Sequence, residues 1–119
     1  MENLESYATV QKWLAANRGG PLLPRPESPE HRLAVLGAYL DHVGVDPDKL
    51  ISVSTDLVEG GTATRNGYLK QLKVWLAGQN LPEGERTRRE NLIRGFFIAN
   101  AIKVMTKPYS DVYKRNPAR

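Results

Sequence analysis

The strongest constraint on the fold is a regular alternation of helix signals and chain breakers along the 119 residues. Apolar residues recur at spacings of three and four, and glycine or proline interrupts each such stretch. This spacing predicts amphipathic helices, because residues three or four apart lie on one helix face. Convincing strand alternation is missing; residues 50–53 are a candidate short strand, but the Asp-Pro before them favours helix. The expected fold class is all-α, a compact bundle of about four to five short helices.

The first expected helix covers roughly residues 4–17. Its apolar stripe consists of Leu4, Tyr7, Val10, Trp13 and Leu14. Gly19 and Gly20 end the helix, and three prolines between residues 21 and 26 cannot continue it. We therefore expect an N-terminal arm, residues 1–26, that is held loosely against the rest.

The second helix has well-defined ends. Ser28 can cap its first turn, Pro29 suits the first helical position, and Gly44 stops it. Asp46 and Pro47 repeat the same start signal for a short third helix. We therefore expect the helical bundle to span residues 27–102, beginning just before this second helix.

Two longer helices follow. One begins near Thr62 or Thr64 and runs to Ala77, with Lys70 and Lys73 off its apolar face. For the next, residues 87–90 (Thr-Arg-Arg-Glu) have the pattern of a capping box, which places its start at Thr87. Asn91 and Arg94 are expected to point away from the apolar stripe. Asn100 can end this helix in a left-handed conformation, and residues 103–119 are expected to form a basic linker.

Composition excludes several classes of chemistry. The chain contains no cysteine, which removes disulfides, thiolate metal sites and cysteine nucleophiles. Its two histidines, His31 and His42, share one expected helix but are about 16 Å apart along the axis, too far to chelate one ion. The glycine pair at residues 60–61 lacks the Lys-Ser/Thr of a phosphate loop. We expect no catalytic residue, metal, cofactor or small-molecule substrate in this chain.

Charge is distributed unevenly. Residues 1–61 carry five Lys/Arg and nine Asp/Glu, a formal charge of −4, whereas residues 62–119 carry twelve and four, a formal charge of +8. Such an asymmetry indicates a surface for a polyanion on the second half, although a solvated soluble face accounts for charge alone equally well. Three arginines at an expected helix start, Arg86, Arg88 and Arg89, favour bound phosphate over solvent there.

Two stretches resemble the core-binding domain of tyrosine recombinases (phage-type integrases). Residues 28–51 read SPEHRLAVLGAYLDHVGVDPDKLI, similar to the family's opening helix with its glycine and Asp-Pro-Asp-x-Leu turn. Residues 68–100 read YLKQLKVWLAGQNLPEGERTRRENLIRGFFIAN, similar to its last two helices. The closing Asn116-Pro117-Ala118 resembles the sequence that often precedes the family's catalytic domain.

The resemblance implies a DNA-binding bundle that covers one face of duplex DNA while a separate catalytic domain covers the other. The family's catalytic motifs have no counterpart here, and Tyr109 and Tyr113 are given no catalytic role, so the chain is expected to be the N-terminal portion of a recombinase. Helices 29–43 and 87–100 would face the major groove. The expected DNA-binding residues are Arg86, Thr87, Arg88, Arg89, Asn91, Arg94, Lys70, Lys73, Lys103, Lys107, His31 and Arg32.

Two other functions stay open. The alternative is a helical protein–protein interaction domain whose basic face binds an acidic partner, and an enzyme is a distant third. We expect a cytoplasmic, nucleoid-associated protein, because neither a signal peptide nor a membrane-spanning segment is evident. The expected partner is double-stranded DNA; whether protomers associate with one another on DNA is left open.

Overall fold

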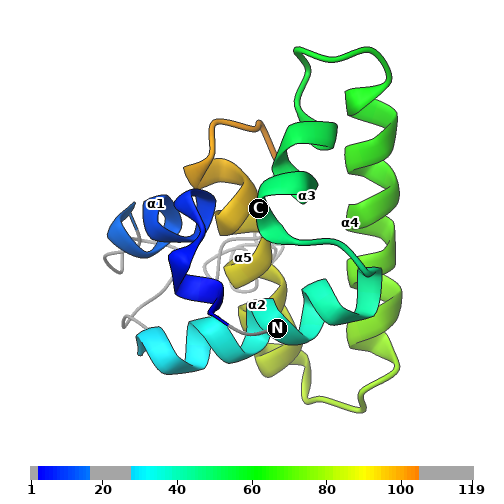
Figure 1. Ribbon diagram of the computed structural model, residues 1–119. Helices are drawn as coiled ribbons and strands as arrows, with labels where there is room; N and C mark the ends of the chain where they lie inside the picture. The colour runs from blue at the N-terminus through cyan, green and yellow to red at the C-terminus, as the bar shows by residue number, and fades with distance from the viewer. Residues whose placement is uncertain (1–2, 17–27, 105–119) are drawn as a thin grey trace, which may run out of the picture.

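The computed structural model describes residues 3–16 and 28–104 (Figure 1). These residues form a short 3₁₀ helix, η1 (Leu4–Ser6), and five α-helices with no strand among them. The α-helices are α1 (Ala8–Ala16), α2 (Pro29–Val43), α3 (Pro47–Ser54), α4 (Gly61–Ala77) and α5 (Glu83–Ala99). The expected all-α bundle is confirmed.

The predicted starts of α2 and α3 are correct to the residue. The Ser28 hydroxyl accepts a hydrogen bond from the backbone N–H of His31 at 3.1 Å, and the Asp46 carboxylate accepts one from Lys49 at 2.7 Å. Gly44 ends α2 with φ 79°, a left-handed conformation that glycine adopts without a Cβ clash. These local signals decide the helix bounds because each satisfies backbone groups that the helix leaves unpaired.

The N-terminal segment is built into the core, so the prediction of a loosely held arm is wrong. Tyr7 is extended (φ −79°, ψ 137°) and divides the expected single helix into η1 and α1. The side chains of Val10 and Trp13 are 0% and 1% exposed. Thr9 of α1 also donates its hydroxyl hydrogen to the Asp48 carboxylate of α3 at 2.6 Å. An apolar stripe that large is stable only when it is buried.

The last helix begins one turn before the predicted capping box. Its first residue is Glu83, preceded by Pro82. The fixed φ of proline suits a helix start, and the acids Glu83 and Glu85 favour the positive end of the helix dipole. Thr87 is therefore an interior helical residue, 7% exposed, and does not act as the N-cap.

The C-terminal end of α5 also differs from the prediction. Asn100 has φ −104°, and Ala101 takes the left-handed conformation instead, with φ 69°. The Asn100 side-chain amide donates hydrogen bonds to the carbonyls of Phe96 (2.9 Å) and Thr9 (3.1 Å). It thus ties the end of α5 to α1.

Helix α5 lies at the centre of the bundle, against α1, α2 and α4 (Figure 1). The ring of Phe96 meets Trp13 edge-on, with centroids 5.8 Å apart. The Tyr39 hydroxyl of α2 donates to the Tyr68 carbonyl of α4 at 2.9 Å, and burial raises the pKa of this phenol. The fully buried large side chains are Trp13, Tyr39, Phe96, Phe97, Leu36, Leu40, Leu50, Leu72, Leu76, Leu92, Ile93 and Val10.

Parts of the predicted organisation lie outside the described residues. These are residues 17–27, which include the proline-rich connector, and residues 105–119 of the expected linker, which include Lys107.

Candidate nucleic-acid interface

Three of the twelve candidate residues are buried in the structure. Arg32 and Asn91 are each 5% exposed, and Thr87 is 7% exposed. Thr87 and Asn91 are buried because α5 packs against three helices, which cover more of its circumference than its apolar stripe alone marks. Arg32 is covered in turn by α1: its guanidinium lies 5.7 Å from the centroid of the Trp13 ring.

Two further arginines of α5 are held in ion pairs within their own helix. Arg89 Nε lies 2.9 Å from a Glu85 carboxylate oxygen, and Arg94 Nη2 lies 2.9 Å from Glu90. The Arg94–Glu90 side chains are only 12% and 15% exposed, so this pair belongs to the packed part of the helix. Arg94 therefore does not point away from the bundle as expected. A carboxylate that neutralises a guanidinium weakens its attraction for phosphate.

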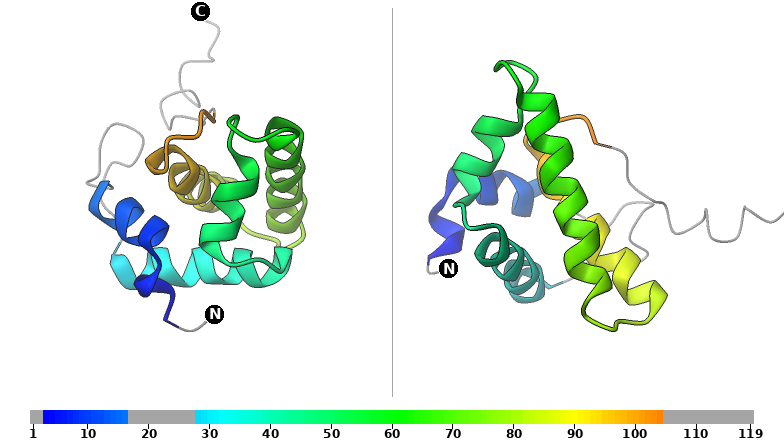
Figure 2. Two further views of the ribbon diagram at one scale, coloured as in Figure 1. Left: turned by 45° about the horizontal axis from the view of Figure 1, so that its top comes forward. Right: turned by 90° about the vertical axis from the view of Figure 1, so that its right-hand side faces the viewer.

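Lys70 and Lys73 are exposed on α4, as predicted. Within residues 3–16 and 28–104, neither lysine forms an ion pair. At about 100° per residue they lie about 140° and 160° around the helix from Trp75, on the side facing solvent. Helix α4 lies along one side of the molecule in Figure 1 and faces the viewer in the right-hand view of Figure 2. The positive charges of the two lysines are thus available to an external anion.

The exposed face of α4 also carries small and amide side chains. Asn66, Gly67, Gln71 and Ala77 are all exposed, as is Val74 at 66%. A Cβ built on Gly67 would meet no atom within 4 Å. Small side chains allow a ligand to approach the helix backbone, and side-chain amides can both donate and accept hydrogen bonds. Sequence reasoning did not single out the amides, although their positions beside the two lysines were a signal for them.

A recess joins α2, α4 and α5 on the other flank of α4. Its volume is about 160 Å³, and its lining residues are His31, Ala34, Val35, Ala38, Trp75, Gln79 and Arg89. The structure thus brings together one candidate of α2 (His31) with one of α5 (Arg89). Trp75 is half-buried and stacks on His42, with ring centroids 5.7 Å apart. The recess offers imidazole, amide and guanidinium N–H groups from α2, the α4–α5 turn and α5.

The remaining candidates are spread along α5. Arg86 and Arg88 are half-buried in its first half. Lys103 follows the other end of this helix, which lies about 17–20 Å along the axis from these two arginines, so it does not share their surface. Instead its charge acts on Asp56 of the α3–α4 loop. The pKa of that carboxyl lies below its ordinary value, chiefly because the Thr62 hydroxyl donates to it.

One cation of the basic half is structural, which sequence reasoning missed. Arg65 is 8% exposed, and its Nη1 donates to the Ser54 carbonyl at 3.2 Å and to the Asp56 carboxylate at 3.0 Å. It contributes to the formal charge but holds the α3–α4 loop on α4.

Comparison with protein-family models, curated proteins and solved structures finds no match to this chain. In the part of the chain that the structure describes, no cluster of His, Cys, Asp or Glu could hold a metal ion. No helix there is both long and apolar enough to cross a bilayer. The exposed candidate residues thus gather in two places, the solvent-facing side of α4 and the recess on its flank, and these two places form the candidate interface.

Proposed function

We propose that this chain is a DNA-binding module that grips duplex DNA with the exposed face of α4, as the core-binding part of a tyrosine recombinase. The observation that carries the proposal is the placement of Lys70 and Lys73, two exposed cations without a carboxylate partner among the described residues. Free surface cations bind the phosphate backbone by releasing its condensed counterions. The similarity of residues 28–51 and 68–100 to core-binding domains supports the same function.

The dimensions of α4 suit a groove of duplex DNA. A helix with its side chains is about 10–12 Å across, and the major groove is about 12 Å wide. With α4 in the groove, Lys70 and Lys73 would reach phosphates of one strand. Arg89 and His31, on the opposite flank, would face the other strand. Asn66 would lie beside the two lysines and Gln71 about 140° further round the helix, so the two side-chain amides would reach opposite margins of the groove.

This arrangement differs from the one expected from sequence, in which helices 29–43 and 87–100 entered the groove. Asn91 and Thr87 are buried, so the last helix has lost its expected base-reading residues. In the proposed arrangement α5 supports α4 from behind, and its first turns approach the backbone through Arg86. Strand cleavage would belong to a separate catalytic domain.

The test is fluorescence anisotropy with a random-sequence duplex at low salt. Lys70→Ala/Lys73→Ala should weaken binding by about 10-fold or more, since each lost phosphate contact removes its counterion release. The matched control is Lys12→Ala/Lys49→Ala, which removes the same charge from exposed positions on α1 and α3. Equal loss in both variants would contradict the assignment to α4. Absence of wild-type binding would contradict DNA binding altogether and favour an acidic protein partner.

A further inference from the structure

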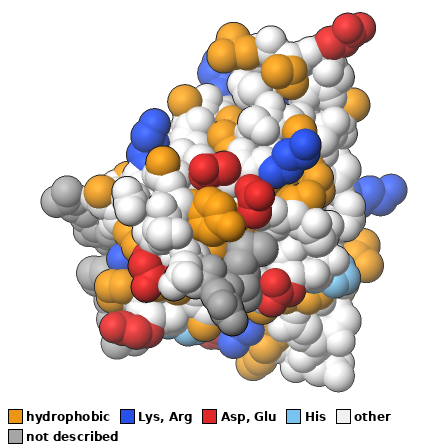
Figure 3. All heavy atoms as spheres, in the orientation of Figure 1, with side chains coloured by type: hydrophobic (Ala, Val, Ile, Leu, Met, Phe, Trp, Pro, Cys, Tyr) orange, Lys and Arg blue, Asp and Glu red, His pale blue; other side chains and the backbone are white. Residues whose placement is uncertain are grey.

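The loop between α3 and α4 presents apolar side chains to solvent. Leu57 is 93% exposed and Val58 is 43% exposed, next to the acidic residue Glu59. Figure 3 shows hydrophobic and acidic side chains together at this end of the molecule. We call residues 57–59 the knob. Single exposed apolar residues are common on protein surfaces, but here two adjacent apolar side chains project from one tight loop.

The knob stands on a well-ordered base. Asp56 accepts hydrogen bonds from the Thr62 hydroxyl at 2.7 Å and from Arg65 at 3.0 Å. Arg65 also donates to the Ser54 carbonyl, and a Cβ on Gly61 would lie 1.8 Å from the Thr55 carbonyl oxygen, so the loop closes tightly on α4. An ordered loop loses little conformational entropy when its apolar tip is bound.

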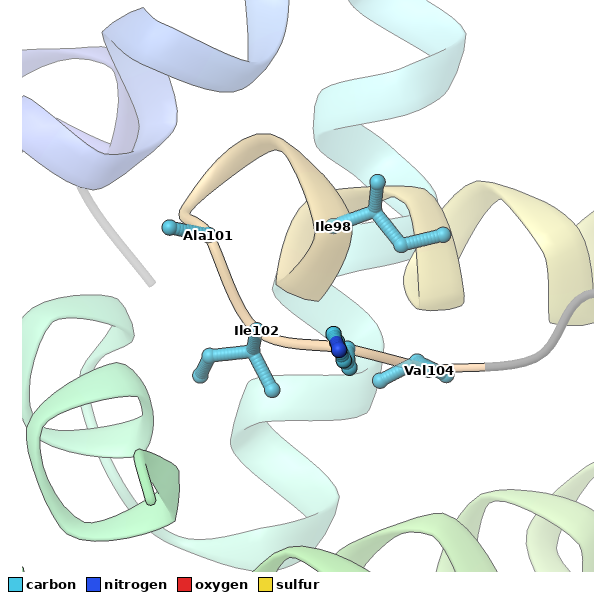
Figure 4. Close-up of a pocket in the computed structure, with 5 residues that line it drawn as sticks. Ile98, Ala101, Ile102 and Val104 are labelled. Carbon is cyan, nitrogen blue, oxygen red and sulfur yellow. The ribbon is translucent and has the colours of Figure 1, made fainter. Parts of the chain in front are cut away.

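An apolar hollow lies beside the knob. It has a volume of about 560 Å³ and is lined by Ile98, Ala101, Ile102, Lys103 and Val104. Ile98 comes from the last turn of α5 and the others from the segment that follows (Figure 4). Ile98 is 44% exposed. The left view of Figure 2 draws residues 101–104 close to the α3–α4 loop, and the charge of Lys103 acts on Asp56 of that loop, so the knob and the hollow lie toward the same end of the molecule.

We propose that this end is a self-association surface on which a second copy of the chain docks, each knob entering the partner's hollow. The two features are complementary in shape, because one projects and the other is recessed. They are also complementary in charge, because Glu59 belongs to the knob and Lys103 to the hollow. A projection and a recess side by side form a self-complementary patch, which a two-fold axis closes into a dimer.

This contact is independent of the proposed DNA interface on α4. It involves three residues of the knob and five of the hollow, far fewer than the roughly 20–30 residues per partner of standard interfaces, so the dimer should be weak and concentration-dependent. Weak pairing of this kind adds to the affinity of two copies that are held close together on one duplex.

Sedimentation equilibrium of the full chain without DNA tests the proposal. The weight-average mass should rise from the monomer value of 13.3 kDa toward twice that value as concentration increases. Leu57→Asp should raise the dimer dissociation constant by at least about 10-fold, as expected for loss of a buried apolar anchor. Val74→Asp is the matched control, because Val74 is 66% exposed but lies near the other end of α4, and it should leave the mass curve unchanged.

A charge exchange keeps the test independent of any effect on folding. Glu59→Lys and Lys103→Glu should each weaken the dimer, and the double variant should recover most of the wild-type association. A wild-type chain that stays monomeric at every concentration, as it would if residues 105–119 of the same chain filled the hollow, overturns the proposal. Association that Leu57→Asp leaves unchanged also overturns it, because the dimer would then use another surface.

Discussion

Replacing Trp13 with alanine tests whether α1 is part of the core. The side chain is 1% exposed, meets Phe96 edge-on and lies beside the Arg32 guanidinium. An aromatic side chain of this kind buries about 150–250 Å², and at about 25 cal/mol per Å² this gives an upper bound of about 4–6 kcal/mol. Truncations of buried tryptophan and phenylalanine cost about 3–5 kcal/mol. We expect a loss in that range for Trp13→Ala.

The measurement is urea unfolding followed by far-ultraviolet circular dichroism. The expected loss is a large part of the roughly 5–15 kcal/mol by which such domains are stable, so the midpoint should fall strongly. Trp13→Phe is the control. Among the described residues Trp13 Nε1 has no hydrogen-bond acceptor, so phenylalanine removes a buried unsatisfied donor and should cost less than about 2 kcal/mol. A loss below about 1 kcal/mol for Trp13→Ala would show that the N-terminal segment is a loose arm after all.

Three other substitutions test the packing around α4. Tyr39→Phe removes the hydrogen bond to a carbonyl of α4 and should lower the unfolding free energy by about 1 kcal/mol in urea titrations. Gly61→Ala forces a Cβ toward the Thr55 carbonyl and should lower the unfolding free energy by about 1–3 kcal/mol. An unchanged unfolding free energy would show that the loop shifts freely to make room for the methyl group. Because the Thr62 hydroxyl holds the pKa of Asp56 below its ordinary value, the ionised carboxylate stabilises the fold above about pH 4, and this contribution is lost as pH falls through the lowered pKa. Asp56→Asn should therefore unfold at lower urea than wild type at pH 7, with the difference shrinking in acid; a pH-independent difference would contradict the argument.

Local signals in the sequence were enough to predict much of the fold. The caps at Ser28 and Asp46 and the stop at Gly44 are decided by residues within one turn of each helix end. The start of α5 was not predictable in this way, because two competing signals lie four residues apart. The Thr87 pattern has the form of a capping box, but Pro82 and the acids after it start the helix first.

The candidate site was harder to predict, because it depends on which faces of each helix other helices cover. Lys70 and Lys73 were placed correctly, since one apolar stripe determines the exposed side of α4. Asn91 and Arg32 were misplaced because α1 and the neighbouring helices bury polar positions that an apolar stripe does not mark. The recess between His31 and Arg89 joins residues 58 positions apart in the chain, and only tertiary packing brings them together.

The most direct test of DNA binding is the salt dependence of affinity for random duplex. With about four to six phosphates contacted, the slope of log affinity against log salt concentration should be near −4 to −5. Lys70→Ala and Lys73→Ala should each make the slope shallower by about one unit, equally for all sequences. A wild-type slope close to zero, or one that neither substitution changes, would contradict the proposal that α4 grips the DNA backbone.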